Sequence, residues 1–359
     1  MGEGFDLRRF FLWKNDHNAN NPNNFVDVSG GSITSGRRRF RPGLVRGMLA
    51  ARLHTMARKA YVFYVTSREY ICHAAINAGR LINGLSADRS IDVMLIVMDG
   101  ARVGEFCLTE CLGSRLKIRI VPKAPWLTEN VYYGQSYLRF EAFRLHDLYD
   151  RVVVLDADGL VMGHLDHLFD LPLTENQPMA VPFAPYLDGP WLSSVVMVVK
   201  PSEALHQTFS QYLTPERLKD VSAFANGSHF DMDVLNYVLR KGRSPLVRIL
   251  PSQYVVLDSD FGMAKGRQLP PKLNSTYYVH FSAKKPLKHP ETRDFADQTN
   301  DFHRLFQVFW RGFDKHCAHL VQKAQTLPAF EGDKGVYYPD PREMAEYIAS
   351  LNLTEIQTD

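Results

Sequence analysis

Blocks of apolar residues alternate with mixed blocks between residue 60 and residue 155 of the chain. Short apolar runs rich in β-branched and aromatic residues, typical of buried strands, occur at 60–66, 91–97, 117–121 and 151–155. Stretches with the spacing and length of helices lie between them, at 69–85, 103–112 and 137–148. Strands that alternate with helices predict an α/β fold with a mostly parallel sheet covered by helices on both faces.

The same kind of pattern continues through the second half of the chain. A helix is expected at 232–240, and strand-like segments occur at 179–182, 195–200, 247–250 and 277–281. From about residue 293 the pattern is mostly helical. We therefore expect one α/β domain over 59–292 and a helical extension over 293–359 that packs on it.

Residues 1–58 differ in composition from the rest of the chain. They contain an Asn-rich polar stretch at 15–24 and a basic run at 37–41. Such segments bury too little apolar surface to offset chain entropy, which predicts a flexible tail or stem. The alternative is a basic segment that binds a membrane surface or a partner, with a helix at 43–57.

Composition and charge exclude some classes of function. The chain has 359 residues, is 45% hydrophobic and carries a formal net charge of +3. This balance argues against a general nucleic-acid binder, and a run of eighteen or more apolar residues that could span a membrane does not occur. The N-terminus lacks the apolar core of a signal peptide, while sequons at Asn226, Asn274 and Asn352 weakly favour a secretory location.

Four cysteines are too few for a disulfide scaffold in a chain of this length: Cys72, Cys107, Cys111 and Cys317. Cys107 and Cys111 could share a helical face, but no further ligand follows at the spacing of a zinc site. We interpret all four as ordinary buried or surface thiols.

Two carboxylates directly follow the most strand-like run, because Asp156 and Asp158 flank Ala157 after residues 151–155. Ligands of open α/β sheets bind outside the carboxyl ends of the strands. Carboxylates at positions i and i+2 can face one hard cation, and Mg²⁺ and Mn²⁺ keep coordination positions open for substrate phosphates. The alternative is a turn with capping aspartates.

A histidine and two lysines follow the late strand at 277–281. An imidazole from His280 that completes a carboxylate site suits Mn²⁺ better than Mg²⁺. Lys285, five residues on, can place its ammonium on a diphosphate as a point charge. The alternatives are a hydrogen-bonded core histidine and a solvated basic loop.

The stretch that runs from 149–161 through 165–172 closely resembles the glycogenin-like retaining glycosyltransferases, family eight of the sugar-transferase classification. Further stretches match that family in the same order, at 65–70, 137–145, 191–202 and 279–286. The resemblance covers about residues 60–290. It implies a single nucleotide-sugar-binding domain of the kind called GT-A, a UDP-sugar donor, Mn²⁺ with Mg²⁺ as the substitute, and retention of anomeric configuration.

The resemblance also assigns residues to roles. Asp156-Ala157-Asp158 would bind the metal and the diphosphate, and His280 would be the third metal ligand. Lys285 and Arg139 would contact the diphosphate or the sugar.

The resemblance places two further residues at the uridine and one at the transferred sugar. Tyr70 would stack on uracil, with Thr66 close by. Asp231 would lie near the transferred sugar or the acceptor, where it positions the acceptor or supports positive charge on the sugar. The alternative for Asp231 is a cap of the helix at 232–240. Because no carboxylate pair of the glycosidase type is evident, front-face substitution is the mechanism we expect.

The chain departs from the family at five positions: Leu192, Ser194, Met232, Ala283 and Leu287. The family usually has amides at the positions of Leu192 and Met232, so the pattern of paired sugar hydroxyls should differ here. These departures make the chain more similar to a fungal branch related to N-acetylglucosaminyltransferases. A less polar pocket could accommodate an acetamido group.

Three functions are left open: transfer of a hexose or N-acetylhexosamine to a glycan or protein-linked acceptor, self-glycosylation at a residue such as Tyr212, and catalytically weak nucleotide-sugar binding. His164 and His167 are interpreted as packing residues rather than a second metal site. A groove lined by tyrosines could receive the acceptor or could equally be core: Tyr132, Tyr133 and Tyr137.

The expected partners are the nucleotide-sugar donor and a glycan or glycoprotein acceptor, and a weak homodimer is left open. Nucleic acid is not expected as a partner. The missing signal and membrane span favour the cytoplasm, whereas relatives of the fungal branch are Golgi enzymes with an N-terminal anchor.

Overall fold

The computed structural model describes residues 57–67, 69–99, 108–122, 131–261, 273–282, 286 and 300–318. All of them belong to one compact unit, Met56–Asp359. The expected tail or stem therefore lies outside the described residues, apart from its last two positions, as do Lys285 and the sequon at Asn352.

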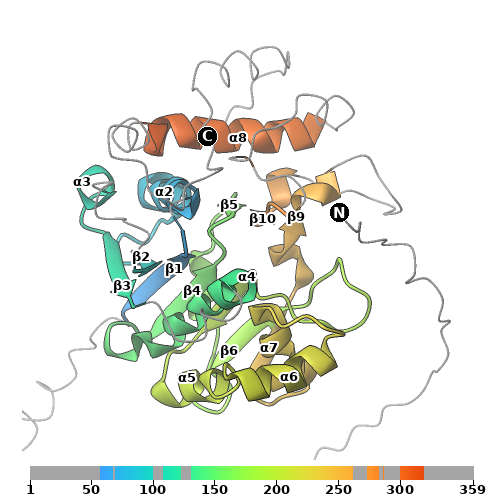
Figure 1. Cartoon of the computed structure of the whole chain (residues 1–359). Helices are drawn as coiled ribbons and strands as arrows, with labels where there is room; N and C mark the ends of the chain where they lie inside the picture. The colour runs from blue at the N-terminus through green and yellow to red at the C-terminus, as the bar shows by residue number, and fades with distance from the viewer. Residues whose placement is uncertain are drawn as a thin grey trace, which may run out of the picture. The chain divides into compact units, whose positions relative to one another are not determined.

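A seven-stranded sheet forms the centre of this unit (Figure 1). Its order is β3-β2-β1-β4-β7-β6-β8, and β7 alone runs antiparallel to both of its neighbours. The strands are β1 (Lys59–Val65), β2 (Asp92–Met98), β3 (Leu116–Val121), β4 (Arg151–Leu155), β6 (Met179–Pro182), β7 (Val196–Val199) and β8 (Val247–Leu250). The predicted α/β fold with a mostly parallel sheet is confirmed.

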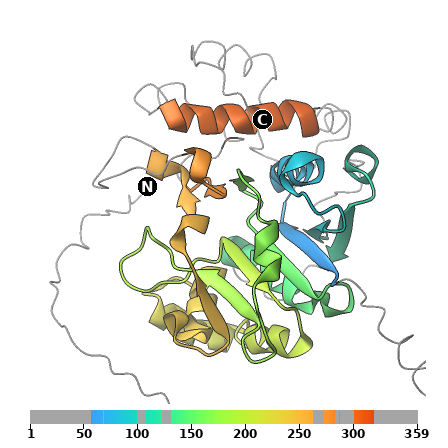
Figure 2. The same cartoon turned by 180° about the vertical axis from the view of Figure 1, so that it is seen from behind.

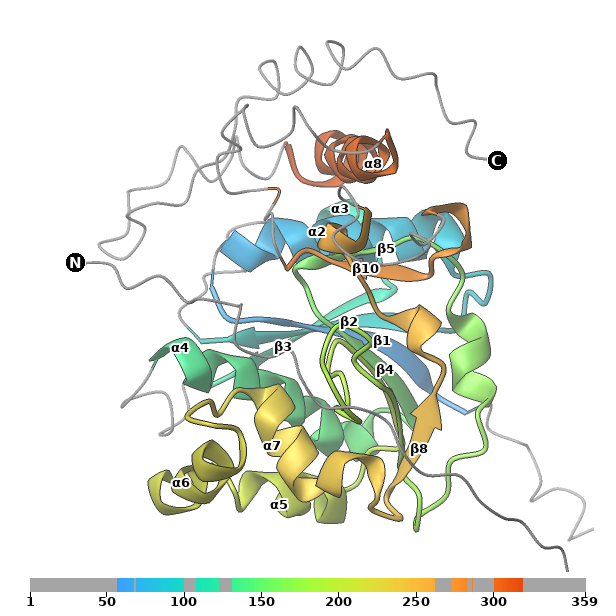
Figure 3. The same cartoon turned by 90° about the vertical axis from the view of Figure 1, so that its right-hand side faces the viewer.

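The inner strands are apolar on both faces because helices cover both faces of the sheet. In β1, Tyr61, Phe63 and Val65 belong to one hydrophobic core, and the alternating Ala60 and Val62 belong to the other. Alternate residues of a strand point to opposite faces, so a strand between two helical layers must be apolar throughout. Figure 3 shows these two layers on either side of the sheet.

One helical layer is formed by helices from the beginning and the end of the described sequence. It contains α2 (Glu69–Arg80), which continues into a π-helical turn at Leu81–Leu85, and α8 (Asn300–His316). Figure 2 shows α8 from behind, in orange, with α2 in blue beside it. The short helix α3 (Leu108–Leu112) is the described part of the helix expected at 103–112.

The other helical layer comes from the middle of the chain. It includes η5 (Gln135–Asp147), a 3-10 helix at the place where a helix was expected over 137–148. Further helices complete this half of the unit: α4 (Val131–Gly134), α5 (Glu203–Ser210), α6 (Pro215–Phe224) and α7 (Asp231–Val238). Short 3-10 turns link the elements at Asp166–Asp170, Arg240–Gly242, Ser252–Tyr254, Asp258–Phe261 and Leu273–Ser275.

A second, three-stranded sheet lies on the α8 side of the central sheet (Figure 1). β10 (Tyr278–His280) pairs antiparallel with β5 (Gly159–Val161) and parallel with β9 (Val256–Leu257). Residues of β5 and β10 share a hydrophobic core with α8. This small sheet brings the late strand at 278–280 next to the segment that follows β4.

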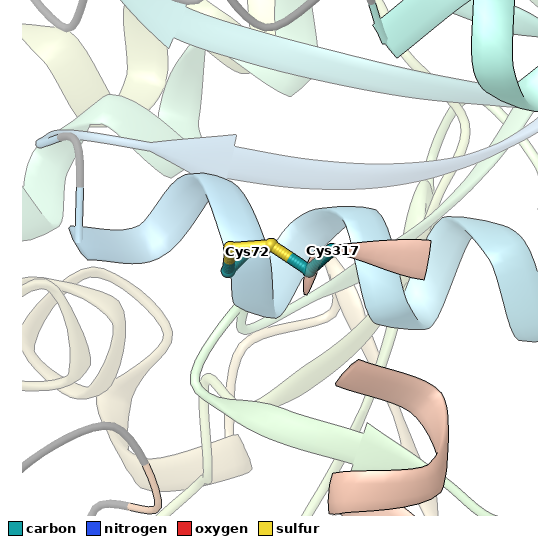
Figure 4. Close-up of a disulfide and its surroundings, with 2 residues drawn as sticks. All are labelled: Cys72 and Cys317. Atoms are coloured by element: carbon teal, nitrogen blue, oxygen red, sulfur yellow. A yellow bond between two sulfur atoms is a disulfide. The ribbon is translucent and has the colours of Figure 1, made fainter. Parts of the chain in front are cut away.

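A disulfide between Cys72 of α2 and Cys317 after α8 corrects the interpretation of these two cysteines as thiols (Figure 4). Their Cα atoms are 5.5 Å apart although 245 residues separate them in sequence. The pair could not be recognised from spacing because only the packing of α8 on α2 brings the two sulfurs together. The side chain of Cys111 and all of Cys107 lie outside the description.

Close backbone approach accounts for two glycines at the contact between α2 and α8. A Cβ at Gly312 would lie 2.7 Å from Cγ2 of Ile76, and a Cβ at Gly79 would collide with the ring of His316. Among the described helices, none is both long and apolar enough to cross a membrane.

Candidate metal centre

The segment 156–158 connects the central sheet to the small sheet. β4 ends at Leu155, and β5 begins at Gly159. Because β4 lies in the middle of the sheet, between β1 and β7, this connection leaves the carboxyl edge at its centre. That is the edge where open α/β sheets place their ligands.

Three side chains converge at this edge: Asp156, Asp158 and His280. Each offers one ligand atom, and these atoms all lie within 4.8 Å of one another. Nε2 of His280 is 3.2 Å from Oδ1 of Asp158 and 3.6 Å from Oδ2 of Asp156. Two carboxylate oxygens and one imidazole nitrogen suit Mn²⁺ and leave other positions for substrate oxygens. The structure thus brings together the three residues expected to bind the metal.

Backbone pairing explains why His280 reaches a segment 122 residues earlier in the chain. His280 pairs with Gly159 in the small sheet, and the amide of Phe281 donates to the carbonyl of Asp158 at 3.1 Å. The hydroxyl of Tyr278 donates to the carbonyl of Asp156 at 2.6 Å. Residue 159 must be glycine because a Cβ there would collide with that tyrosine hydroxyl.

Asn77 of α2 holds the backbone of the same segment, and sequence reasoning did not identify it. Its side-chain amide donates to the carbonyls of Ala157 at 3.3 Å and Gly159 at 2.8 Å, and its Oδ1 accepts from the amide of Val161 at 2.8 Å. Asn77 is fully buried. An asparagine in a helix gives no local signal of this role, since its partners lie 80 to 84 residues away.

A buried arginine joins Asp156 to Asp231. Nη2 of Arg139 hydrogen-bonds to Oδ1 of Asp156 and to the hydroxyl of Tyr64. Its Nη1 lies 2.8 Å from Oδ2 of Asp231 and donates to the carbonyl of Ser194 at 2.6 Å. The side chain of Arg139 is only 2% exposed. Arg139 thus pairs with two carboxylates, and its contact with the donor stays a prediction.

The balance of charge at this cluster depends on burial. Burial raises the pKa of Asp156 above its ordinary value, and the nearby Asp158 and Asp231 act in the same direction, while Arg139 and His280 oppose them. Burial would lower the pKa of Arg139, but Asp156 and Asp231 raise it overall, so the guanidinium stays charged. A divalent cation between the carboxylates would favour their ionised forms.

Asp231 is the first residue of α7 and does not cap it, so the capping alternative is wrong. The capping contact comes from Asp233, whose Oδ2 accepts from the amide of Phe230 at 2.8 Å. The carboxylate of Asp231 is thereby left to face Arg139, and its backbone amide donates to Oγ of Ser136 at 3.0 Å.

Two residues expected at the uridine lie where β1 leads into α2. Thr66 is buried just after β1, and Tyr70 lies half-buried in the first turn of α2, with its ring 6.2 Å from that of His73. Their contact with a nucleotide stays a prediction, as does the role of Lys285.

Two of the five departures from the family pattern, Leu192 and Met232, lie beside each other, because the side-chain amide of Asn236 donates to both of their carbonyls. Leu192 is fully buried in the hydrophobic core next to η5 and α7, and its backbone is held by the side-chain amide of Asn236. Met232 lies one turn before Asn236, with its sulfur 3.9 Å from the hydroxyl of Tyr186.

The histidines and tyrosines that the sequence singled out contact neighbouring groups of the protein: His164, His167, Tyr133 and Tyr137. Nδ1 of His164 is 2.7 Å from the carbonyl of Leu85, and Nε2 of His167 is 2.7 Å from the hydroxyl of Tyr254. Tyr133 stacks near His229, and the hydroxyl of Tyr137 donates to the backbone of that histidine.

Comparison with protein-family models gives no match. The chain is 27% identical over 192 residues to a protein of Gibberella zeae named glucose N-acetyltransferase 1, covering 50% of this chain and 40% of that protein. It is 26% identical over 235 residues to UDP-glucuronate:xylan alpha-glucuronosyltransferase 1 of Arabidopsis thaliana, covering 64% and 32%. The chain therefore spans less than half the length of these curated relatives.

Solved structures with related folds have low identity to the chain. A galactosyltransferase, LgtC, in complex with donor and acceptor sugar analogues is 14% identical, with a TM-score of 0.48 over 70% of this chain and 99% of that one. Mouse xyloside xylosyltransferase 1 is 12% identical, with a TM-score of 0.44 over 64% and 99%. The α/β fold of this chain is therefore assigned from its own strand order.

Proposed function

We propose that the chain is a metal-dependent, retaining glycosyltransferase that transfers a hexose or N-acetylhexosamine from a UDP-sugar to a glycan or protein-linked acceptor. The convergence of Asp156, Asp158 and His280 at the centre of the carboxyl edge carries this proposal. The curated relative from Arabidopsis, named for transfer from UDP-glucuronate, supports it. The resemblance to the glycogenin-like family supports the donor class and the stereochemistry.

The three proposed metal ligands would act on the leaving diphosphate. Asp156, Asp158 and His280 would hold Mn²⁺, which neutralises charge on the diphosphate as the sugar leaves. Asp158 is the more accessible carboxylate of the two, with a side chain 15% exposed against 7% for Asp156. Asp158 is therefore the ligand best placed to share a cation with substrate oxygens.

Arg139 would act as a positioning residue in this scheme. Its guanidinium fixes the carboxylates of Asp156 and Asp231 through one planar group, which suits arginine better than lysine. Asp231 would then lie at a fixed distance from the metal site, where its negative charge supports positive charge developing on the sugar.

Release of UDP tests the proposal directly. We expect Mn²⁺-dependent release from at least one of UDP-N-acetylglucosamine, UDP-glucose, UDP-galactose and UDP-glucuronate, and none in EDTA. Asp158→Asn should lower kcat by at least about 100-fold. The matched control is Asp170→Asn, since the side chain of Asp170 is 76% exposed and pairs only with Lys59 among the described residues.

Two outcomes would contradict the proposal. Equal release in EDTA, or near-normal turnover by the Asp158→Asn variant in saturating Mn²⁺, would remove the metal assignment. The absence of release from all four donors would remove the transferase assignment and leave nucleotide-sugar binding. The anomeric configuration of the product, read by NMR, tests retention.

A further inference from the structure

A cavity of about 720 Å³ lies between the C-terminal end of α2 and α8. Its walls come from the π-helical turn after α2, the residue after β5, the turn at 273–275 and one face of α8. Asp156, Asp158 and His280 are not among the lining residues. Met162, which lines it, is four residues beyond Asp158, or about 13 Å along an extended chain.

Positive charge is concentrated on the walls of this cavity. Arg80, Arg311 and Lys315 line it together with His316, and no carboxylate lines it within the described ranges. Arg311 and Lys315 lie one turn apart on α8, so their side chains share the same helix face. Both are exposed.

Arg80 is a partly buried cation without an ion-pair partner among the described residues. Its Nε donates to the carbonyl of Val161 at 2.9 Å, and its two terminal nitrogens make no hydrogen bond within the described residues. Burial lowers the pKa of Arg80 to about 10, with no acidic neighbour to raise it. A desolvated guanidinium of this kind is stabilised by an anion placed on its free edge.

The remaining walls combine hydrogen-bonding and apolar side chains. Two side-chain amides, from Asn83 and Asn274, provide donors and acceptors suited to hydroxyl groups. Apolar side chains form the rest of the lining: Leu85, Met162, Leu273 and Val308. The volume lies in the range of small-molecule sites, about 300–1,000 Å³.

Covalent and steric constraints hold the two helices that form the cavity. The Cys72–Cys317 disulfide ties the last turn of α8 to α2, and Gly79 and Gly312 bring the helix backbones close together. The cationic face is thus held in place before any ligand arrives, which reduces the entropy cost of binding.

We propose that this cavity is a second carbohydrate site, which takes a monosaccharide unit that carries a phosphate or a carboxylate. Arg80, Arg311 and Lys315 would bind the anionic group, and the amides of Asn83 and Asn274 would bind hydroxyls. The inference does not depend on the proposed transfer reaction, since it uses none of the metal ligands.

Calorimetric titration of the full chain, in EDTA and without nucleotide sugar, tests the site. The probes are glucose 6-phosphate, glucuronate, uncharged glucose and inorganic phosphate. We expect glucose 6-phosphate, glucuronate or both to bind at least ten-fold more tightly than glucose and than phosphate alone. Binding of glucose 6-phosphate would show that the site takes a phosphate, and binding of glucuronate would show that it takes a carboxylate.

Charge reversal separates this site from the metal centre. The double variant Arg311→Glu/Lys315→Glu should weaken binding of the anionic sugar at least ten-fold, because both side chains are exposed and their loss leaves the core intact. Lys219→Glu, at an exposed position of α6, is the matched control and should bind as the wild type does. Asp158→Asn should also bind normally, so failure of the transferase assignment would leave this result unaffected.

Three results would overturn the inference. They are the absence of binding by both anionic sugars, equal affinity for glucose or for phosphate alone, and unchanged affinity in the double variant with an unchanged melting temperature.

Discussion

Asn77 holds the backbone of the proposed metal site without being one of its ligands. Its three contacts with residues 157, 159 and 161 fix the backbone that carries Asp158 and leads into β5. Groups that orient metal ligands from behind typically account for ten- to hundred-fold in metal affinity. Asn77 therefore belongs to the machinery of the proposed site.

Asn77→Asp should raise the Mn²⁺ concentration needed for half-maximal UDP release by about ten-fold, with a smaller effect on kcat at saturating metal. The carboxylate keeps the shape of the side chain but loses the two donors to the carbonyls of Ala157 and Gly159. Metal titrations of activity provide the measurement. Gln211→Glu is the control, since Gln211 is exposed and belongs to neither proposed site, and an equal shift in both variants would argue against this role.

Glu141 in η5 provides a test of electrostatics away from the site. Its oxygens lie 3.6 Å from Nε2 of His206 and 3.6 Å from Nη1 of Arg144. Burial acts to raise the pKa of Glu141, but the hydrogen bond and charge of His206, with help from Arg144, lower it overall. A carboxyl whose pKa is lower in the folded chain than in the unfolded chain stabilises the folded state. This stabilisation is fully present at pH values above the pKa of the unfolded chain, about 4.3, and it is lost as the pH falls through the pKa of the folded chain.

Glu141→Gln should therefore destabilise the chain by about 1 kcal/mol at pH 7 and by much less at pH 3, where the wild-type carboxyl is protonated in both states. Urea unfolding at the two pH values measures this difference. Glu175→Gln, at an exposed carboxylate paired with Lys200, should change little at either pH. A loss that is independent of pH would mean that packing, rather than charge, is responsible.

Sequence reasoning identified the site residues whose signal is local or carried by the family resemblance. Asp156 and Asp158 flank Ala157 directly after one apolar run, and His280 lies near the end of another. It did not identify Asn77, Tyr64 or Tyr278, because their partners at the site are backbone groups or side chains 75 to 122 residues away. It also did not predict that Arg139 pairs with two carboxylates, since a motif cannot show which side chains meet the two ends of a guanidinium.

At the scale of elements, strands were predicted best. The runs at 60–66, 91–97 and 151–155 match β1, β2 and β4 within one residue at each end. Strands buried on both faces are apolar throughout, so their ends are easy to recognise in the sequence. The helix at 137–148 was located correctly but is a 3-10 helix, which apolar spacing alone does not distinguish. α8 (Asn300–His316) lies within the stretch that the pattern predicts to be helical from residue 293.

The packing of α8 on α2 requires a residue without a side chain at position 312. Gly312→Ala should destabilise the chain by about 1–3 kcal/mol, because the new methyl group overpacks against Ile76. Gly84→Ala is a matched control, since no atom lies within 4 Å of a Cβ built there, and it should be neutral or slightly stabilising. Urea unfolding of both variants compares them, and equal stabilities would contradict the close approach.

At the scale of the whole molecule, one bond joins the first helix of the described unit to its last. Replacing both cysteines, as Cys72→Ser/Cys317→Ser, should cost about 2–5 kcal/mol of stability. Wild-type protein in reductant should melt at the temperature of the double variant, and reductant should leave the double variant unchanged. An unshifted melting temperature in reduced wild type would show that the bond does not form in solution.

The sequence separation of the two cysteines also determines how long Cys72 waits for its partner during synthesis. At synthesis rates of roughly 5–20 residues per second, the 245 residues between Cys72 and Cys317 take about 12 to 50 s to make. During this interval α2 has neither its covalent partner nor the helix that covers it, and Cys107 and Cys111 are made first. Cys72 therefore remains an unpaired thiol, alongside Cys107 and Cys111, until Cys317 has been made and α8 can pack on α2.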